Sequence, residues 1–110
     1  MSPSDYKDEK LNRNEARKQI ARIMSQSPQN VRFSRHAIEE LADDGLAVTD
    51  AINVLVSPDS KIHQDGELEN GNYRYRLETS NLVIVLGFWR DGSGLNVVTA
   101  WDKRKGRHRK

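Results

Sequence analysis

The chain has 110 residues, 31% of them charged, and a formal net charge of +2. This length holds one domain with a modest core and leaves too little apolar sequence for a second. The sequence contains no cysteine, which excludes disulfides, thiolate metal sites and a cysteine nucleophile. No apolar run is long enough to span a membrane, and the amino terminus lacks the apolar core of a signal peptide, so we expect a soluble, cytoplasmic protein.

The amino-terminal quarter predicts a tail followed by a helix. Residues 1–11 carry too little apolar surface to offset the entropy of ordering, and we expect a flexible tail there. Asn12 and Glu15 have the spacing of a capping box, and apolar residues then recur at helical intervals up to about Gln26. Pro28 ends this first helix.

Two further helices are predicted before the first long strand. Ser34 is a good N-cap, and Gly45 stands where the second helix needs a left-handed residue to end. Thr49 or Asp50 can cap a third helix, which stops before Pro58. The apolar residues expected on the buried face of the second helix are Ala37, Ile38 and Leu41.

The second half of the chain predicts strands. Residues 57–72 are mostly polar and are interpreted as loop, with room for a short edge strand at 61–64. Apolar and charged residues alternate over 73–78, which indicates a strand with one charged face. The segment 82–89 is continuously apolar, as in a central strand covered on both faces, and a turn separates it from a strand at 95–101.

This order of elements predicts a single α+β domain over residues 12–102. The amino-terminal helices are expected to pack on one face of a small antiparallel β-sheet. Residues 103–110, KRKGRHRK, form a basic carboxy-terminal tail. Such a tail can add salt-sensitive, sequence-independent binding to nucleic acid, although basic termini are also often idle or bind an acidic partner protein.

Arg35 and His36 stand together at the start of the second predicted helix. The positive end of the helix macrodipole disfavours the imidazolium form, and a neutral imidazole can act as a general base. The first backbone N–H groups of this helix, including that of Ala37, could form an anion site that the Arg35 guanidinium reinforces. The alternative is that His36 only packs beside Phe33 and that Arg35 is a solvated surface residue.

Arg74 and Arg76 share one face of the strand predicted around them. They would lie roughly 7 Å apart, close enough to bind one phosphodiester or two neighbouring ones. Their alternative role is cross-strand pairing with Glu69 or Glu78. Tyr75, between them, is a candidate proton donor or stacking platform, although a tyrosine in a strand more often packs in the core.

Further basic and aromatic residues lie near the predicted strand ends and could hold RNA by charge and stacking. For the tryptophans among them, core anchoring is the alternative. The three histidines have no metal-ligand spacing, and the acidic residues of 39–44 indicate a solvated helix face, so neither a metal nor a cofactor is expected. The residues expected to bind flanking nucleotides are Arg35, Arg90, Trp101, Lys103 and Arg104.

A resemblance to a known family is carried by four segments: VRFSRHAIEELADDGL, GELENGNYRYRL, LVIVLGFW and NVVTAW. They resemble the small bacterial domain family DUF4258 and, more distantly, the MqsR, BrnT and RelE groups of toxin–antitoxin ribonucleases. The resemblance covers about Val31 to Trp101 and rests most on His36 and on the R-Y-R of residues 74–76. It implies a RelE- or barnase-like ribonuclease fold that needs no metal. The chain departs from the pattern in lacking the lysine-rich catalytic strand of some relatives, so the general base stays open.

From the residues and the resemblance together we expect the toxin of a toxin–antitoxin system, acting as an endoribonuclease on mRNA. The ribose 2′-hydroxyl would attack the adjacent phosphate and leave a cyclic phosphate. His36 is expected to be the general base or acid, Arg74 and Arg76 to neutralise the charge of the phosphorane, and Tyr75 to orient the phosphate or donate a proton. The resemblance also implies an antitoxin protein as partner. The alternatives are a non-catalytic nucleic-acid-binding module and a protein-interaction domain with a basic tail.

Overall fold

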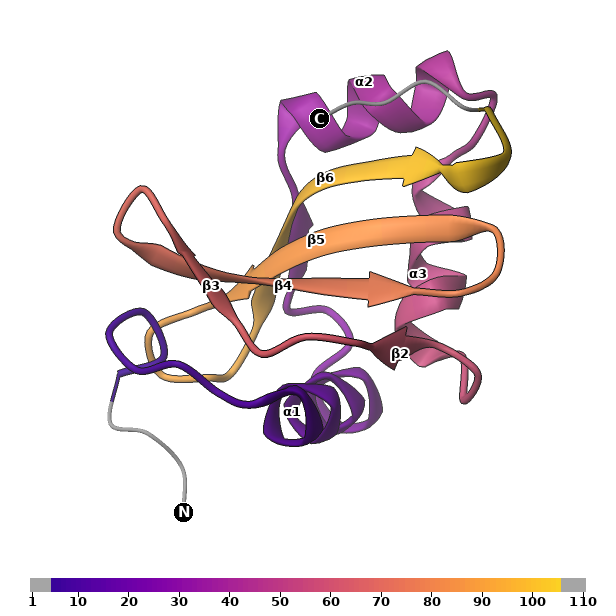
Figure 1. Ribbon diagram of the computed structural model, residues 1–110. Helices are drawn as coiled ribbons and strands as arrows, with labels where there is room; N and C mark the ends of the chain where they lie inside the picture. The colour runs from indigo at the N-terminus through magenta and orange to yellow at the C-terminus, as the bar shows by residue number, and fades with distance from the viewer. Residues whose placement is uncertain (1–4, 106–110) are drawn as a thin grey trace.

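The structure, a computed structural model, describes residues 5–105. Within them, three α-helices pack against a six-stranded sheet, which confirms the predicted α+β class (Figure 1). The helices are α1 (Arg13–Gln26), α2 (Arg35–Asp43) and α3 (Val48–Val56). The strands are β1 (Val31–Phe33), β2 (Lys61–Ile62), β3 (Glu67–Glu69), β4 (Asn72–Glu78), β5 (Leu82–Phe88) and β6 (Leu95–Asp102), followed by a short 3-10 helix, η1 (Lys103–Lys105).

The sheet is mixed, whereas the sequence predicted an antiparallel one. Its strands run in the order β1-β6-β5-β4-β2, and β3 pairs with the end of β4 that β2 leaves free. β1 lies parallel to β6, with Val31 opposite Leu95, and the other paired strands are antiparallel. The prediction is therefore wrong in this one strand, because three residues carry no period that a sequence pattern could show.

A β-bulge in β6 reverses which of its side chains face the core. Leu86 lies opposite Val97, but the residue before Leu86 lies opposite Thr99, so Val98 is the extra residue. Before the bulge the odd-numbered residues of β6 are buried, and at its end the even-numbered ones are. Trp101 therefore lies on the face of the sheet opposite to the core.

The hydrophobic core lies between the three helices and one face of β4, β5 and β6, as the sequence predicted. We call the opposite face, which carries Arg74, Arg76, Val85, Gly87 and Trp101, the open face. The largest fully buried side chains of the core are Ile20, Leu41, Leu55, Tyr75, Leu77, Ile84, Leu86, Phe88, Leu95 and Val97.

The described part of the amino-terminal segment is packed against the domain. Tyr6 and Leu11 are both buried in the core cluster, and the Tyr6 ring lies 5.9 Å from that of Phe88. The Tyr6 N–H also donates to the carbonyl of Arg90 at 2.9 Å. Residues 5–11 therefore belong to the folded domain, and the prediction of a flexible tail is wrong for them, because these two apolar side chains offset the entropy of ordering. Residues 1–4 lie outside the described residues.

Three of the predicted helix ends are confirmed. Asn12 and Glu15 form a reciprocal capping box at the start of α1. Ser34 is the N-cap of α2, and its side chain accepts from a backbone N–H of the first turn. Gly45 follows α2 with φ 76°, a left-handed conformation that glycine adopts without a Cβ clash. These local signals therefore placed α1 and the amino-terminal end of α2 correctly.

Two details of the predicted helices are wrong. The N-cap of α3 is Ala47, one residue before the helix, and Asp50 lies inside it with its carboxylate accepting from the Ala47 N–H at 2.8 Å. Neither Thr49 nor Asp50 is therefore the cap. Ile38 is 46% exposed and does not belong to the buried face of α2, because this helix turns only a narrow side toward the core.

The segment predicted as loop, residues 57–72, contains two strands. The short edge strand was expected, and β2 occupies its first half. β3 was not expected, and it forms a tight hairpin with β4 through Asn70 and Gly71, whose φ angles are 52° and 81°. An Asn-Gly pair in this conformation is the standard two-residue hairpin turn.

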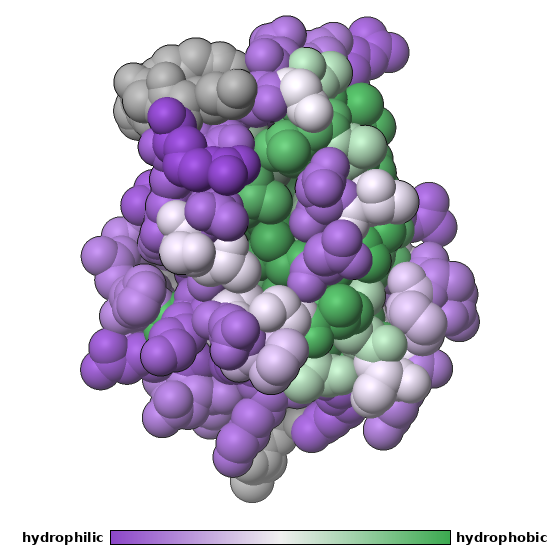
Figure 2. Space-filling view, turned by 90° about the vertical axis from the view of Figure 1, so that its right-hand side faces the viewer, coloured by the Kyte–Doolittle hydropathy of each residue, from purple (hydrophilic) through white to green (hydrophobic). Residues whose placement is uncertain are grey.

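Apolar side chains also lie outside the core. Figure 2 shows an apolar area among hydrophilic side chains on the side of the molecule where α3 lies. Val56 of α3 is one large apolar residue that is half exposed. No helix between residues 5 and 105 is long and apolar enough to cross a bilayer.

Ser34 connects α2 to the bulged part of β6, and its replacement tests this connection. Its hydroxyl accepts from Ala37 N–H and donates to the carbonyl of Val98, both at 3.0 Å. We expect Ser34→Ala to lower the free energy of unfolding by about 1–2 kcal/mol, because both bonds are lost. Denaturant titration measures this change, and Ser25→Ala, on the exposed side of α1, is the matched control. Equal effects of the two variants would contradict the role given to Ser34.

Candidate functional site

A cavity of about 560 Å³ opens on the open face of the sheet. Its floor comes from β4, β5 and β6, one side from the start of α2, and another side from the β3–β4 hairpin. Two predicted catalytic arginines and the predicted histidine therefore border the same cavity. The lining residues are His36, Glu67, Leu68, Glu69, Asn70, Arg74, Tyr75, Arg76, Val85, Val98, Thr99 and Trp101.

Arg74 lies flat on the sheet because its neighbour on β5 is a glycine. A Cβ atom at Gly87 would lie 2.6 Å from Arg74 Nη1, so the guanidinium occupies the space that any side chain would fill. Arg74 forms an ion pair with Glu69, the alternative that the sequence left open, but Nε lies 3.8 Å from Glu69 Oε1 and this buried donor has no hydrogen-bond acceptor. A buried donor without an acceptor costs about 1–3 kcal/mol, so a ligand oxygen that moved into contact with Nε would be bound favourably.

Arg76 stands two residues along the same strand, on the same face. Its guanidinium carbon lies 5.3 Å from the centre of the Trp101 ring, within the range of a cation–π interaction. No carboxylate among residues 5–105 forms an ion pair with Arg76. The stacking on Trp101 therefore positions a positive charge in the cavity without neutralising it.

His36 is the second residue of α2 and borders the cavity with a largely exposed ring. Its side chain is 65% exposed, and Nε2 lies 4.0 Å from Glu40 Oε1. The same Glu40 oxygen accepts from the Thr99 hydroxyl at 3.2 Å, which connects it to β6. This carboxylate can orient the imidazole, and an exposed imidazole is accessible to a ligand in the cavity.

The predicted anion site at the start of α2 is only partly available. The Ala37 N–H is already bonded to the Ser34 hydroxyl, so it is not a free donor. Arg35 is exposed and does not border the cavity. Its predicted role beside a phosphate therefore finds no support in this geometry.

Tyr75 does not have the position that a catalytic role requires. Its side chain points to the core, is 2% exposed, and packs on the Phe88 ring at 5.2 Å between ring centres. The Tyr75 hydroxyl accepts from Leu11 N–H at 2.9 Å. Tyr75 borders the cavity, but its hydroxyl lies on the other face of the sheet from Arg74 and Arg76, as the alternation of a strand demands. We therefore assign it a structural role.

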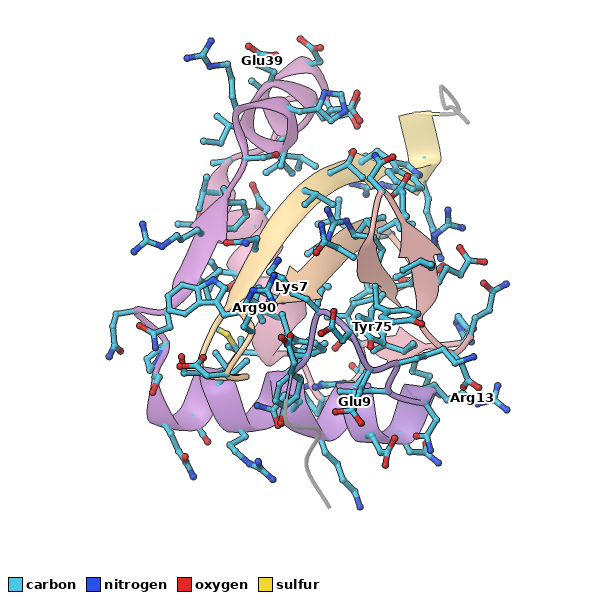
Figure 3. The ribbon with its side chains drawn as sticks, turned by 90° about the vertical axis from the view of Figure 1, so that its left-hand side faces the viewer. Lys7, Glu9, Arg13, Glu39, Tyr75 and Arg90 are labelled. Atoms are coloured by element: carbon cyan, nitrogen blue, oxygen red, sulfur yellow. The ribbon has the colours of Figure 1, made fainter. Side chains whose placement is uncertain are left out.

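Three of the predicted RNA-binding residues are engaged elsewhere. Arg90 forms an ion pair with Asp5 at 2.6 Å and lies beside the amino-terminal segment, near Lys7 (Figure 3). Lys103 pairs with Glu78 at 2.8 Å. Only Trp101 of the five borders the cavity.

Arg104 makes two side-chain bonds to the buried carboxylate of Asp102, at 2.9 and 3.0 Å. It does not border the cavity either. Residues 106–110 of the predicted tail lie outside the described residues. Among residues 5–105, no group of three His, Asp or Glu side chains has a metal-binding arrangement.

Sequence reasoning missed two features that shape the cavity. The first is Gly87, and a glycine inside an apolar strand is itself a signal that another group approaches the backbone closely. The second is the β3–β4 hairpin with Glu67 and Glu69, which the Asn70-Gly71 pair could have indicated. The hairpin signal was outweighed by the polar composition of residues 57–72, and Gly87 by the continuous apolar pattern of the strand around it.

Comparison with known proteins adds no assignment. No family model, no curated protein and no solved structure matches this chain. The resemblance to DUF4258 and to RelE-like toxins therefore stays a prediction from the sequence, and the function must be argued from the cavity.

Replacing Tyr75 by phenylalanine separates the structural role from the catalytic one. We expect Tyr75→Phe to lower the free energy of unfolding by about 1–3 kcal/mol, because Leu11 N–H loses its acceptor. Any activity of the cavity should be unchanged, as measured beside the unfolding curve. Loss of activity without loss of stability would show that Tyr75 takes part in the chemistry.

The stability lost in Tyr75→Phe should also depend on pH. Burial raises the pKa of the Tyr75 hydroxyl above its ordinary value of 10.0, although the bond from Leu11 acts in the opposite direction. A raised folded pKa means that the contribution of the hydroxyl is complete below about pH 10 and is lost as the pH rises further. Denaturant titrations of both proteins at pH 8 and above pH 10 should therefore give a smaller difference at the higher pH.

Proposed function

We propose that the cavity binds single-stranded RNA and cleaves it without a metal ion, as an endoribonuclease. The observation that carries the proposal is the convergence of an unsatisfied Arg74, an ion-pair-free Arg76 and an accessible His36 on one cavity. A planar guanidinium matches the oxygens of a phosphate, and two of them on one strand face match one phosphodiester or two.

The Trp101 ring favours the binding of single-stranded over double-stranded RNA. An indole beside an arginine is a stacking surface for an unpaired base, and bases in a duplex are not free to stack on it. Arg76 already lies over this ring, so a base can stack on the guanidinium or replace it. A phosphate bound by Arg74 and a base at Trp101 would place one nucleotide along the floor of the cavity.

The reaction needs two proton transfers. The 2′-oxygen attacks phosphorus as its proton passes to a base, and the bond to the 5′-oxygen breaks as that oxygen receives a proton from an acid. The products are a 2′,3′-cyclic phosphate and a free 5′-hydroxyl. His36 carries one of these protons, and Glu67 or Glu69, which border the same cavity, carries the other. Arg74 and Arg76 stabilise the charge that builds up on the phosphorane oxygens.

An endoribonuclease of this kind would act on mRNA in the cytoplasm and would harm the cell that makes it. The proposal therefore includes a neutralising protein, an antitoxin, that blocks the cavity. Two acidic side chains, Glu67 and Glu69, already border the cavity with the two arginines, so a partner must compete with them for the same positive charges.

Cleavage of a labelled single-stranded RNA in EDTA tests the proposal. We expect wild type to produce cyclic phosphate ends, and His36→Ala to reduce the rate by about 100-fold or more while it retains RNA binding. Arg74→Ala with Arg76→Ala should lose both cleavage and binding. The matched control removes two exposed positive charges from α1, Lys18→Ala with Arg22→Ala.

Two results would contradict this proposal in different ways. If the wild type cuts neither free nor ribosome-bound RNA but binds it through the two arginines, the protein is a nucleic-acid-binding module. If the control variant loses as much as the arginine pair, the effect is one of net charge and the cavity has no special role.

Gly87 offers a test that leaves every charged residue in place. A methyl group at this position would displace the Arg74 guanidinium, whose flexible end can move away. We expect Gly87→Ala to weaken RNA binding by roughly tenfold, the value of one bond to a charged group. The methyl group would also lie 3.3 Å from the Tyr73 carbonyl oxygen, so an unfolding curve of the variant is the control for stability. In an Arg74→Ala background the same substitution should have no further effect, because the residue that it displaces is gone. Additive losses in the double variant would show that Gly87 acts independently of Arg74.

A further inference from the structure

The open face carries a second arginine–tryptophan pair beyond the edge of the cavity. The guanidinium carbon of Arg32 lies 5.4 Å from the centre of the Trp89 ring, nearly the same distance as in the Arg76–Trp101 pair. Neither Arg32 nor Trp89 borders the cavity described above. The chain has only two tryptophans, and each one belongs to such a pair.

Strand pairing places both pairs on the same face of the sheet. Gly87, beneath Arg74, lies opposite Asn96 of β6, and Asn96 in turn lies opposite Arg32 of β1. The Trp89 indole N–H donates to the Asn96 side chain at 3.1 Å. Since residues opposite one another share a face, Arg32 and Trp89 continue the row that begins at Trp101 and passes through Arg74.

The Trp89 ring is held in a fixed position with a cation on it. The backbone of Gly94 packs against the indole so closely that a Cβ there would lie 2.6 Å from the ring. Arg32 itself is exposed, and no carboxylate among residues 5–105 forms an ion pair with it. The indole covers one face of the planar Arg32 guanidinium. A nucleobase can stack on the other face.

The two pairs are too far apart for one nucleotide to reach both. Trp101 lies opposite Val83, and Trp89, directly after the end of β5, is six residues further along the chain, which corresponds to roughly 20 Å at the rise of a β-strand. Arg74 lies between them, over Gly87. The face therefore presents a base platform, a phosphate-binding guanidinium and a second base platform in a line.

We propose that Arg32 and Trp89 form a second nucleotide-binding subsite, so that the open face binds a single strand several nucleotides long across the sheet. This inference rests on the proposed function, because the first subsite is the cavity itself. It makes binding dependent on length: short oligonucleotides occupy the cavity alone, and longer ones also reach Arg32.

Intrinsic fluorescence tests the subsite, because each tryptophan reports on one pair. Trp101→Phe leaves Trp89 as the reporter, and Trp89→Phe leaves Trp101. The probes are 2′-O-methyl oligoadenylates of two, four, six and eight nucleotides, which lack the attacking hydroxyl and therefore cannot be cleaved. We expect the shortest oligomer to change only the emission of Trp101, and the longer ones to change that of Trp89 as well.

Variants of Arg32 complete the experiment without changing either tryptophan. Arg32→Ala and Arg32→Lys should both weaken the binding of the eight-nucleotide probe several-fold and leave the two-nucleotide probe unaffected, because lysine keeps the charge but not the stacking plane. Arg22→Ala, an exposed arginine on α1, is the control for net charge. Two results overturn the subsite but not the proposed function. One is a response of Trp101 with no response of Trp89 at any probe length. The other is binding of the eight-nucleotide probe by Arg32→Lys with the affinity of the wild type. If neither tryptophan responds to any probe, both are wrong.

Discussion

Which residues lie on the open face depends on the alternation of side chains along β4, β5 and β6. In β6 the bulge at Val98 reverses this alternation. In β4 the alternation places Tyr75 in the core and both arginines outside. In β6 the same rule would bury Trp101 and expose Asp102, and the extra residue at the bulge inverts this outcome. The Ser34 hydroxyl donates to the carbonyl of Val98, so the N-cap residue of α2 also stabilises the bulge. The positions of His36 and Trp101 are thus linked through one hydroxyl.

The open face also carries polar groups whose placement lowers the stability of the folded protein. Arg74 keeps a buried donor unsatisfied, and two further arginines are held on indole rings with no acidic partner in the described chain. At the end of β6, by contrast, Arg104 pairs with Asp102 and Lys103 with Glu78. A buried donor without an acceptor departs from local consistency, and such departures are typical of functional surfaces.

Sequence patterns located most of the fold and part of the cavity. The capping box of Asn12, the cap of Ser34 and the two-residue period of β4 are local signals, and each gave the right element. The parallel pairing of β1 and the bulge at Val98 depend on residues far apart in the chain, and no local pattern encodes them. Tyr75 was misassigned for a related reason: the period shows that it faces away from its neighbours, but only the packed core shows that Leu11 binds its hydroxyl.

The connection between Ser34 and Val98 spans 64 positions of the chain, and this separation affects how the protein forms. Contacts between distant segments close large loops and form late and slowly. β1 and α2 leave the ribosome early, but they find their partner only when β6 has been synthesised. A nascent chain therefore has helices and a hairpin before it has a floor for the cavity. The order of synthesis itself delays the surface that we propose to bind RNA until β6 has left the ribosome.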